Sequence, residues 1–205
     1  MDIKLIMAYT GAICILLYFL IMIYLHVKFK NYNPIFHAVS DYGVGNSRKF
    51  QIISGVLSII GSTALISIFL IWDKNFEGKN KIILWLFVRI FTVIGVVVFP
   101  TDIEGHKKTG RGLLHYLFAI LQFTAVINLT SDLTSIFTSM EIGNAFKSSL
   151  SILNQIVRYS LAGVILAMLI PILKKVFGLI ERVFLFSSAI YFLILNIVLI
   201  TILKY

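Results

Sequence analysis

The sequence predicts an all-α fold, a polytopic transmembrane bundle of six helices that forms a single domain over residues 1–205. Hydrophobic residues make up 59% of the chain, which exceeds the roughly 45–50% found in soluble domains. Only 13% of the residues are charged, and they cluster between long apolar runs. Six of these runs have lengths close to the about 20 residues that a helix needs to cross the hydrocarbon core. The short connections between them favour an up-and-down bundle.

The first predicted helix covers residues 5–25 and contains Cys14, the only cysteine. The start of the chain lacks the basic segment of a signal peptide, so we expect this helix to be retained. A lone cysteine excludes a disulfide within the chain and a cysteine-based zinc site. The second predicted helix covers residues 51–72 and carries serines at i, i+4 spacing, which lets a neighbouring helix approach closely. These serines are Ser54, Ser58 and Ser62.

The remaining four helices follow from the same length criterion. The third is predicted over residues 82–99 and ends before Pro100, which cannot continue a helix. The other three predicted helices cover residues 112–130, 152–173 and 183–203.

Lysine and arginine residues predict how the bundle is oriented. The side that holds the connections after the first, third and fifth helices carries ten of them, and the other side carries six. Because short cytoplasmic loops are enriched in Lys and Arg, the first side is predicted to be cytoplasmic and both termini outside. We therefore expect a multi-pass protein of the cell membrane with membrane lipids as partners. The net charge of +9 lies at helix ends rather than along a basic stripe, so nucleic-acid binding is not expected.

Two polar connections on the predicted cytoplasmic side hold the residues best suited to chemistry. They run over residues 33–43 and 99–115, and together they contain three of the four histidines and three of the nine acidic residues. Carboxylate and imidazole groups near a membrane are costly unless they are paired, hydrated or bound to a metal. Their concentration at one end of the bundle predicts a shared polar pocket.

Such a pocket could bind zinc, which takes imidazole and carboxylate ligands and activates water near neutral pH. His115 lies about one turn inside the fourth predicted helix, and Asp102 lies just beyond the third. These two residues are therefore the first candidates for metal ligands, and His106 or His37 could complete the set.

Ser40 and Asp41 could orient a ligand or transfer a proton, which gives a predicted catalytic set of Ser40, Asp41, Asp102 and His115. The alternative interpretation is structural. Asp41 could cap a turn, Asp102 could cap the turn after Pro100, and His106 could be a solvated loop residue beside two lysines. The chain contains no H-E-x-x-H, no G-x-S-x-G and no phosphate-binding glycine loop that would decide between the two interpretations.

Two arginines lie inside predicted helices, Arg89 in the third and Arg158 in the fifth. A buried arginine is costly in lipid and normally faces a partner or a water-filled cavity. We therefore expect both side chains to face the bundle interior, either in hydrogen bonds between helices or as residues that bind an anionic ligand.

The two connections also carry a resemblance to a known family. The sequence resembles the membrane proteins filed as domain of unknown function 998, over nearly the whole chain. The resemblance rests on HAVSDYG at 37–43, FPTD at 99–102, Leu114-His115, and Gly178 with Glu181-Arg182. That family looks like a larger group of membrane hydrolases, including alkaline ceramidases and adiponectin-receptor type proteins, which hold zinc with histidines and act on lipid amides. The resemblance implies site roles for Ser40, Asp41, Asp102 and His115, although Arg111 stands where some relatives have another histidine.

These observations lead to one functional expectation and two alternatives. The expectation is a membrane enzyme that hydrolyses a lipid with the help of a metal, with zinc as the cofactor. The first alternative is a non-enzymatic bundle that binds or moves a lipid or a small solute, in which Arg89 and Arg158 matter more than Asp102 and His115. The second alternative is an accessory membrane subunit whose polar loops dock a cytoplasmic partner.

Overall fold

The computed structural model describes residues 2–72, 76–103 and 107–204. Over these residues it contains six long helices and no strand. All six are long and apolar enough to cross a membrane, so the predicted all-α transmembrane bundle is confirmed. The helices are α1 (Ile3–Lys28), α2 (Arg48–Leu70), α3 (Lys79–Val98), α4 (Gly110–Ser139), α5 (Asn144–Leu169) and α6 (Phe177–Lys204).

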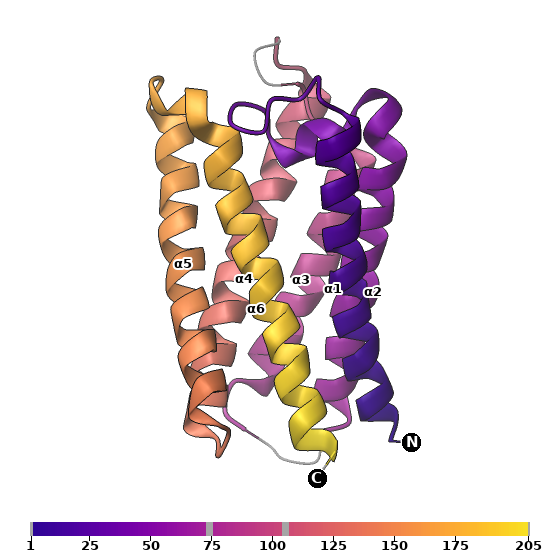
Figure 1. Cartoon of the computed structure of the whole chain (residues 1–205), viewed down its shortest axis with the longest axis vertical. Helices are drawn as coiled ribbons and strands as arrows, with labels where there is room; N and C mark the ends of the chain where they lie inside the picture. The colour runs from indigo at the N-terminus through magenta and orange to yellow at the C-terminus, as the bar shows by residue number, and fades with distance from the viewer. Residues whose placement is uncertain (1, 73–75, 104–106, 205) are drawn as a thin grey trace.

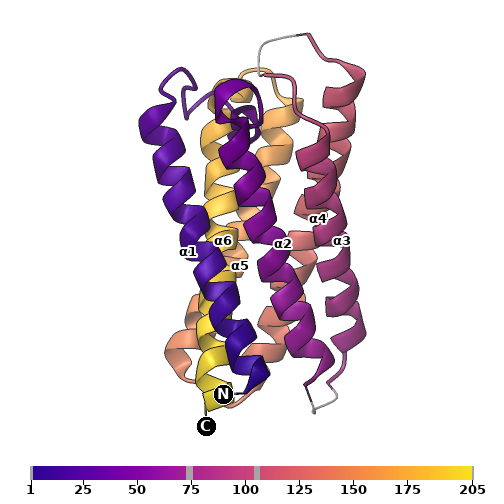
Figure 2. The same ribbon diagram turned by 90° about the vertical axis from the view of Figure 1, so that its right-hand side faces the viewer.

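The helices alternate in direction along the chain and close into a ring (Figure 1 and Figure 2). Each helix packs against the next one in the sequence, and α6 also packs against α1. Both chain termini lie at one end, called the termini end, and the connections after α1, α3 and α5 lie at the other, called the loop end (Figure 1). The two termini therefore share one side, as the sequence predicts. Which side of the membrane each end faces stays a prediction.

Most of the outer surface of the ring is apolar, and the interior contains polar groups. Large hydrophobic side chains point outward, among them Phe91 at 63% exposure and Leu169 at 72%, which suits contact with lipid chains. Inside the ring, Ser62 and Asn196 are almost fully buried. Each donates a hydrogen bond to a backbone carbonyl four residues earlier, at 2.8 and 2.7 Å. Polar side chains are thus accommodated between the helices without breaking them.

Two helices extend further toward the termini end than their predicted ranges, 112–130 and 152–173. α4 continues to Ser139 and α5 begins at Asn144. Polar residues interrupt the apolar pattern here, but hydroxyl groups bond back to the helix, as when Thr134 donates to the Thr130 carbonyl at 2.6 Å. At its other end α5 stops at Leu169, before the predicted end, because Pro171 cannot continue a helix.

The connection after α1, residues 29–47, folds inward over the loop end and is called the covering loop. It contains two short 3-10 helices, η1 (Val39–Gly43) and η2 (Gly45–Ser47). Its side chains Val39 and Tyr42 are buried, so this loop covers the interior of the ring instead of projecting into solvent.

Candidate functional site

A cavity of about 170 Å³ lies inside the ring, between α1, α2, α3, α4, α6 and the covering loop. It reaches from the loop end to beyond the middle of the bundle. Aliphatic and aromatic side chains form much of its wall, including Val93, Leu57 and Phe184. Its polar lining residues are Tyr18, Ser40, Arg48, Gln51, Ser54, Ser58, Arg89, Thr101, His115, Gln122, Glu181, Ser188 and Asn196.

Arg89 lies on the deep part of the cavity wall, near the middle of α3. Its Nη1 donates a hydrogen bond to the Ser62 hydroxyl at 2.7 Å, and its guanidinium lies 4.7 Å from the centroid of the Phe192 ring. Its Nε has no hydrogen-bond partner among the described residues, and neither has Oδ1 of Asn196, which lines the same cavity. The side chain therefore faces the interior, as expected, with hydrogen-bonding capacity left over.

His115 and Ser40 line the same cavity near the loop end. His115 is 3% exposed, and its Nδ1 lies 2.8 Å from the Phe99 carbonyl oxygen. A carbonyl only accepts, so Nδ1 carries the proton in this contact. Glu181 from α6 also lines this part of the cavity, and its Oε2 accepts a hydrogen bond from the Val39 backbone N–H at 2.6 Å.

Asp102 and Asp41 are placed apart from the cavity lining. Asp102 Oδ2 accepts from the Thr109 backbone N–H at 2.6 Å, and Oδ1 accepts from the Thr109 hydroxyl at 2.9 Å. It also contacts Gly112, where any side chain would collide with the carboxylate. Asp102 thus holds the start of α4 through Thr109. Asp41 is fully buried within η1.

The described residues do not fit a metal site of three ligands. Among them, no group of three or more His, Cys, Asp or Glu side chains is arranged to hold a metal ion. The predicted ligand His37 accepts a hydrogen bond from the Asn33 backbone N–H at its Nδ1, at 2.9 Å. His106, another predicted ligand, lies outside the described residues. The zinc site therefore stays a prediction.

The sequence did not predict the role of Arg182, which fixes the covering loop to α6. Its Nη1 donates to the backbone carbonyls of Pro34 and His37 at 2.8 and 2.6 Å. Its Nε donates to Nε2 of His26 in α1 at 2.8 Å. The Tyr42 ring lies beside the guanidinium, 6.0 Å from centroid to Cζ, and burial raises the pKa of the Tyr42 phenol. One arginine thus joins α1, α6 and the covering loop.

Gly178 allows this close approach. A Cβ at this position would collide with the His37 carbonyl oxygen, and the backbone N–H of Leu179 donates to the Ile35 carbonyl at 3.0 Å. The signal in the sequence was a charged pair, Glu181-Arg182, in the first turns of an apolar run and just after Gly178. A charged pair in that position predicts a buried polar network in the membrane.

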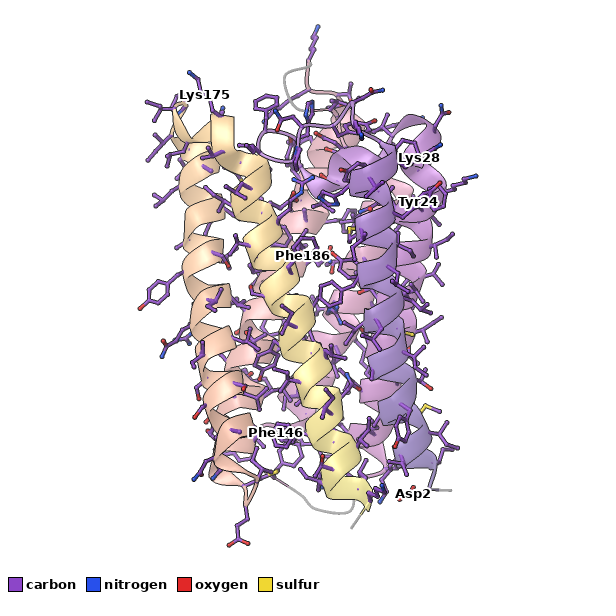
Figure 3. The ribbon with its side chains drawn as sticks, viewed as in Figure 1. Asp2, Tyr24, Lys28, Phe146, Lys175 and Phe186 are labelled. Carbon is purple, nitrogen blue, oxygen red and sulfur yellow. The ribbon has the colours of Figure 1, made fainter. Side chains whose placement is uncertain are left out.

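Arg158 lies on the outer surface of the bundle, so the expectation that it faces the interior is wrong. The buried face of α5 contains Val157 and Val164, and the next residue after Val157 is turned by about 100° around the helix. Arg158 donates to the Ser131 hydroxyl of α4 from Nε and Nη2, at 3.4 and 3.2 Å. Figure 3 labels Phe146, near the start of α5 at the termini end, and Lys175, which follows α5 at the loop end.

A family model described as "Protein of unknown function (DUF998)" matches residues 12–198 of the chain. No curated protein and no solved structure matches it. The expected likeness to ceramidases and adiponectin-receptor type proteins therefore has no support from these matches.

Proposed function

The chain belongs to the family of membrane proteins of unknown function DUF998. We propose that it binds a small organic anion inside its bundle, with Arg89 as the cation that holds the anionic group. This is the non-enzymatic alternative from the sequence, with the ligand specified as an anion and the binding site as the cavity at Arg89.

The observation that carries the proposal is the uncompensated charge of Arg89. The salt bridges present among the described residues do not include it, and its Nε lacks a hydrogen-bond partner there. Taking a charged side chain out of water costs several kcal/mol unless a counter-ion or further hydrogen bonds offset the loss. A guanidinium is suited to a carboxylate or a phosphate, because its planar N–H groups can donate two parallel hydrogen bonds. A bound anion would supply the missing partner.

The cavity wall suggests the rest of the ligand. Between Arg89 and the loop end the lining is formed mainly by apolar side chains such as Val93, Leu57 and Phe184. The volume of about 170 Å³ is similar to that of an apolar cavity of about 150 Å³ known to hold benzene. The cavity is thus suited to a small molecule or a single short chain rather than a two-chain phospholipid. We infer a ligand with one anionic group and a short apolar body.

The loop end of the cavity offers a second set of polar contacts. Ser40, Gln51 and His115 present neutral donors and acceptors, and these can bond to water or to a polar group at the far end of the ligand. The charged lining side chains are Arg48, Arg89 and Glu181, so their sum is positive at neutral pH. This balance also favours an anion.

The proposal is tested with octanoate and octanol, which share an apolar chain and differ in charge. Thermal unfolding of the purified protein in neutral detergent is measured with each compound, using the wild type and the variant Arg89→Gln. We expect octanoate to raise the unfolding temperature of the wild type and to have little effect on Arg89→Gln. Octanol should have a small effect that is equal in both proteins.

Lys174→Gln is the control, because it removes an exposed cation between α5 and α6, outside the cavity. It should respond to octanoate as the wild type does. Equal stabilisation of wild type and Arg89→Gln by octanoate, or equal effects of octanoate and octanol on the wild type, would overturn the proposal.

A further inference from the structure

A polar patch lies on the outer surface of α3, α4 and α5, away from the cavity. This outer basic patch consists of Lys81, Asn128, Ser131, Asp132 and Arg158. Lys81 Nζ lies 3.0 Å from Asp132 Oδ1, and the guanidinium of Arg158 donates to Ser131 at 3.2 and 3.4 Å. Ser131 and Asp132 are neighbours on α4. Lys81 therefore reaches α4 from α3, and Arg158 reaches it from α5.

These contacts also fix the depth of the patch in the membrane. Lys81 lies in the first turn of α3, a helix whose 20 residues span about 30 Å, the thickness of the hydrocarbon core. Its ammonium group therefore lies at the membrane boundary on the termini end. The Cα of Arg158 lies deeper, but helical side chains are directed toward the helix N-terminus, which for α5 is the termini end. Its guanidinium thus extends toward the same boundary.

The charge of the patch leaves one cation without an acidic partner. Lys81 and Arg158 are positive, and Asp132 is the one acid in the patch, paired with Lys81. Arg158 has only the Ser131 hydroxyl as a side-chain partner among the described residues, at long distances. An exposed guanidinium at the level of the lipid headgroups attracts phosphate.

The surface beside the patch is suited to lipid chains. Toward the loop end, most outward side chains of α4 and α5 are apolar, and Leu117, Ile120, Ile165 and Leu169 are between 50% and 72% exposed. We infer that the outer basic patch binds the phosphate of an anionic phospholipid in the leaflet at the termini end, with the acyl chains along α4 and α5. A lipid satisfies both the isolated cation and the apolar surface next to it.

The test uses phosphatidylglycerol and phosphatidylcholine, added to the whole protein in neutral detergent and followed by native mass spectrometry. We expect the wild type to retain phosphatidylglycerol in preference to phosphatidylcholine. Arg158→Gln should bind phosphatidylglycerol about fivefold more weakly, the change expected for one basic residue near an anionic headgroup. Arg158→Lys, which keeps the charge, should recover most of the affinity.

Lys175→Gln is the matched control, since it removes one exposed cation at the loop end, outside the patch, and should leave the site intact. Lys81→Gln is a second test within the patch and should also weaken binding. Unchanged phosphatidylglycerol affinity in both patch variants overturns the inference. So does a change of oligomeric state in Arg158→Gln without a change in lipid affinity, which would assign the patch to a protein interface. Binding of octanoate is measured separately, so this inference and the role of Arg89 can fail independently.

Discussion

Replacing Arg182 by methionine removes the side chain that holds the covering loop on α6. Arg182 donates to His26 and to the carbonyls of Pro34, His37 and Gly178, at distances from 2.6 to 2.9 Å. A hydrogen bond from a charged group contributes about 1.5–3 kcal/mol, and a buried carbonyl that loses its partner costs further free energy. Because these bonds act as one network and methionine recovers some packing, we expect a loss of about 3–5 kcal/mol rather than the full sum.

For a chain of this size, each kcal/mol lowers the unfolding temperature by about 2–4 °C. Thermal unfolding of Arg182→Met in detergent should therefore occur about 6–20 °C below the wild type. Trypsin should also cleave faster at Lys30, which lies in the covering loop. Arg158→Met is the control, because its two hydrogen bonds are long and exposed, and surface contacts of this kind contribute less than about 1 kcal/mol. Equal unfolding temperatures for the two variants would refute the role of Arg182.

Three further predictions concern the loop, the metal and the orientation. Gly178→Ala should lower the free energy of unfolding by about 1–3 kcal/mol, because its methyl group collides with the His37 carbonyl; thermal unfolding measures this, and an unchanged stability would contradict it. If the predicted zinc site exists, the purified protein contains about one zinc per chain and His115→Ala loses it; equal, negligible zinc in both proteins removes the metal-dependent hydrolase from consideration. If the loop end is cytoplasmic, an impermeant thiol reagent labels a cysteine placed at Lys79 in intact cells but labels one at Lys107 only after permeabilisation, and the reverse pattern inverts the orientation.

The six spanning helices could be predicted because a transmembrane helix leaves a strong local signal, a run of about 20 apolar residues. The ends of the helices were harder to predict. The predicted range 112–130 stops before Ser131 and Asp132, yet α4 continues to Ser139. Hydropathy alone registers polar residues as the end of a span, whereas the backbone stays helical when hydroxyls bond back to it and charged groups reach the headgroups.

The site was predicted in part, for a physical reason. Arg89 faces the cavity as expected and His115 shares it with Ser40, because both histidine and arginine inside a span require a polar environment. Which face of a helix a single residue occupies depends on its neighbours in space, and this is why Arg158 was placed wrongly. The contacts of Arg182 join it to residues more than 140 positions away, and pairings of that kind leave no pattern along one sequence.

The most direct test of the central claim is a structure of the protein determined with 8-bromooctanoate, whose heavy atom marks the end of the chain. Our account predicts a carboxylate oxygen within about 3 Å of the Arg89 guanidinium, with the bromine inside the cavity on the side of the loop end. A cavity that stays empty while the compound binds to the outer surface, or a carboxylate placed at the covering loop instead of at Arg89, would contradict it.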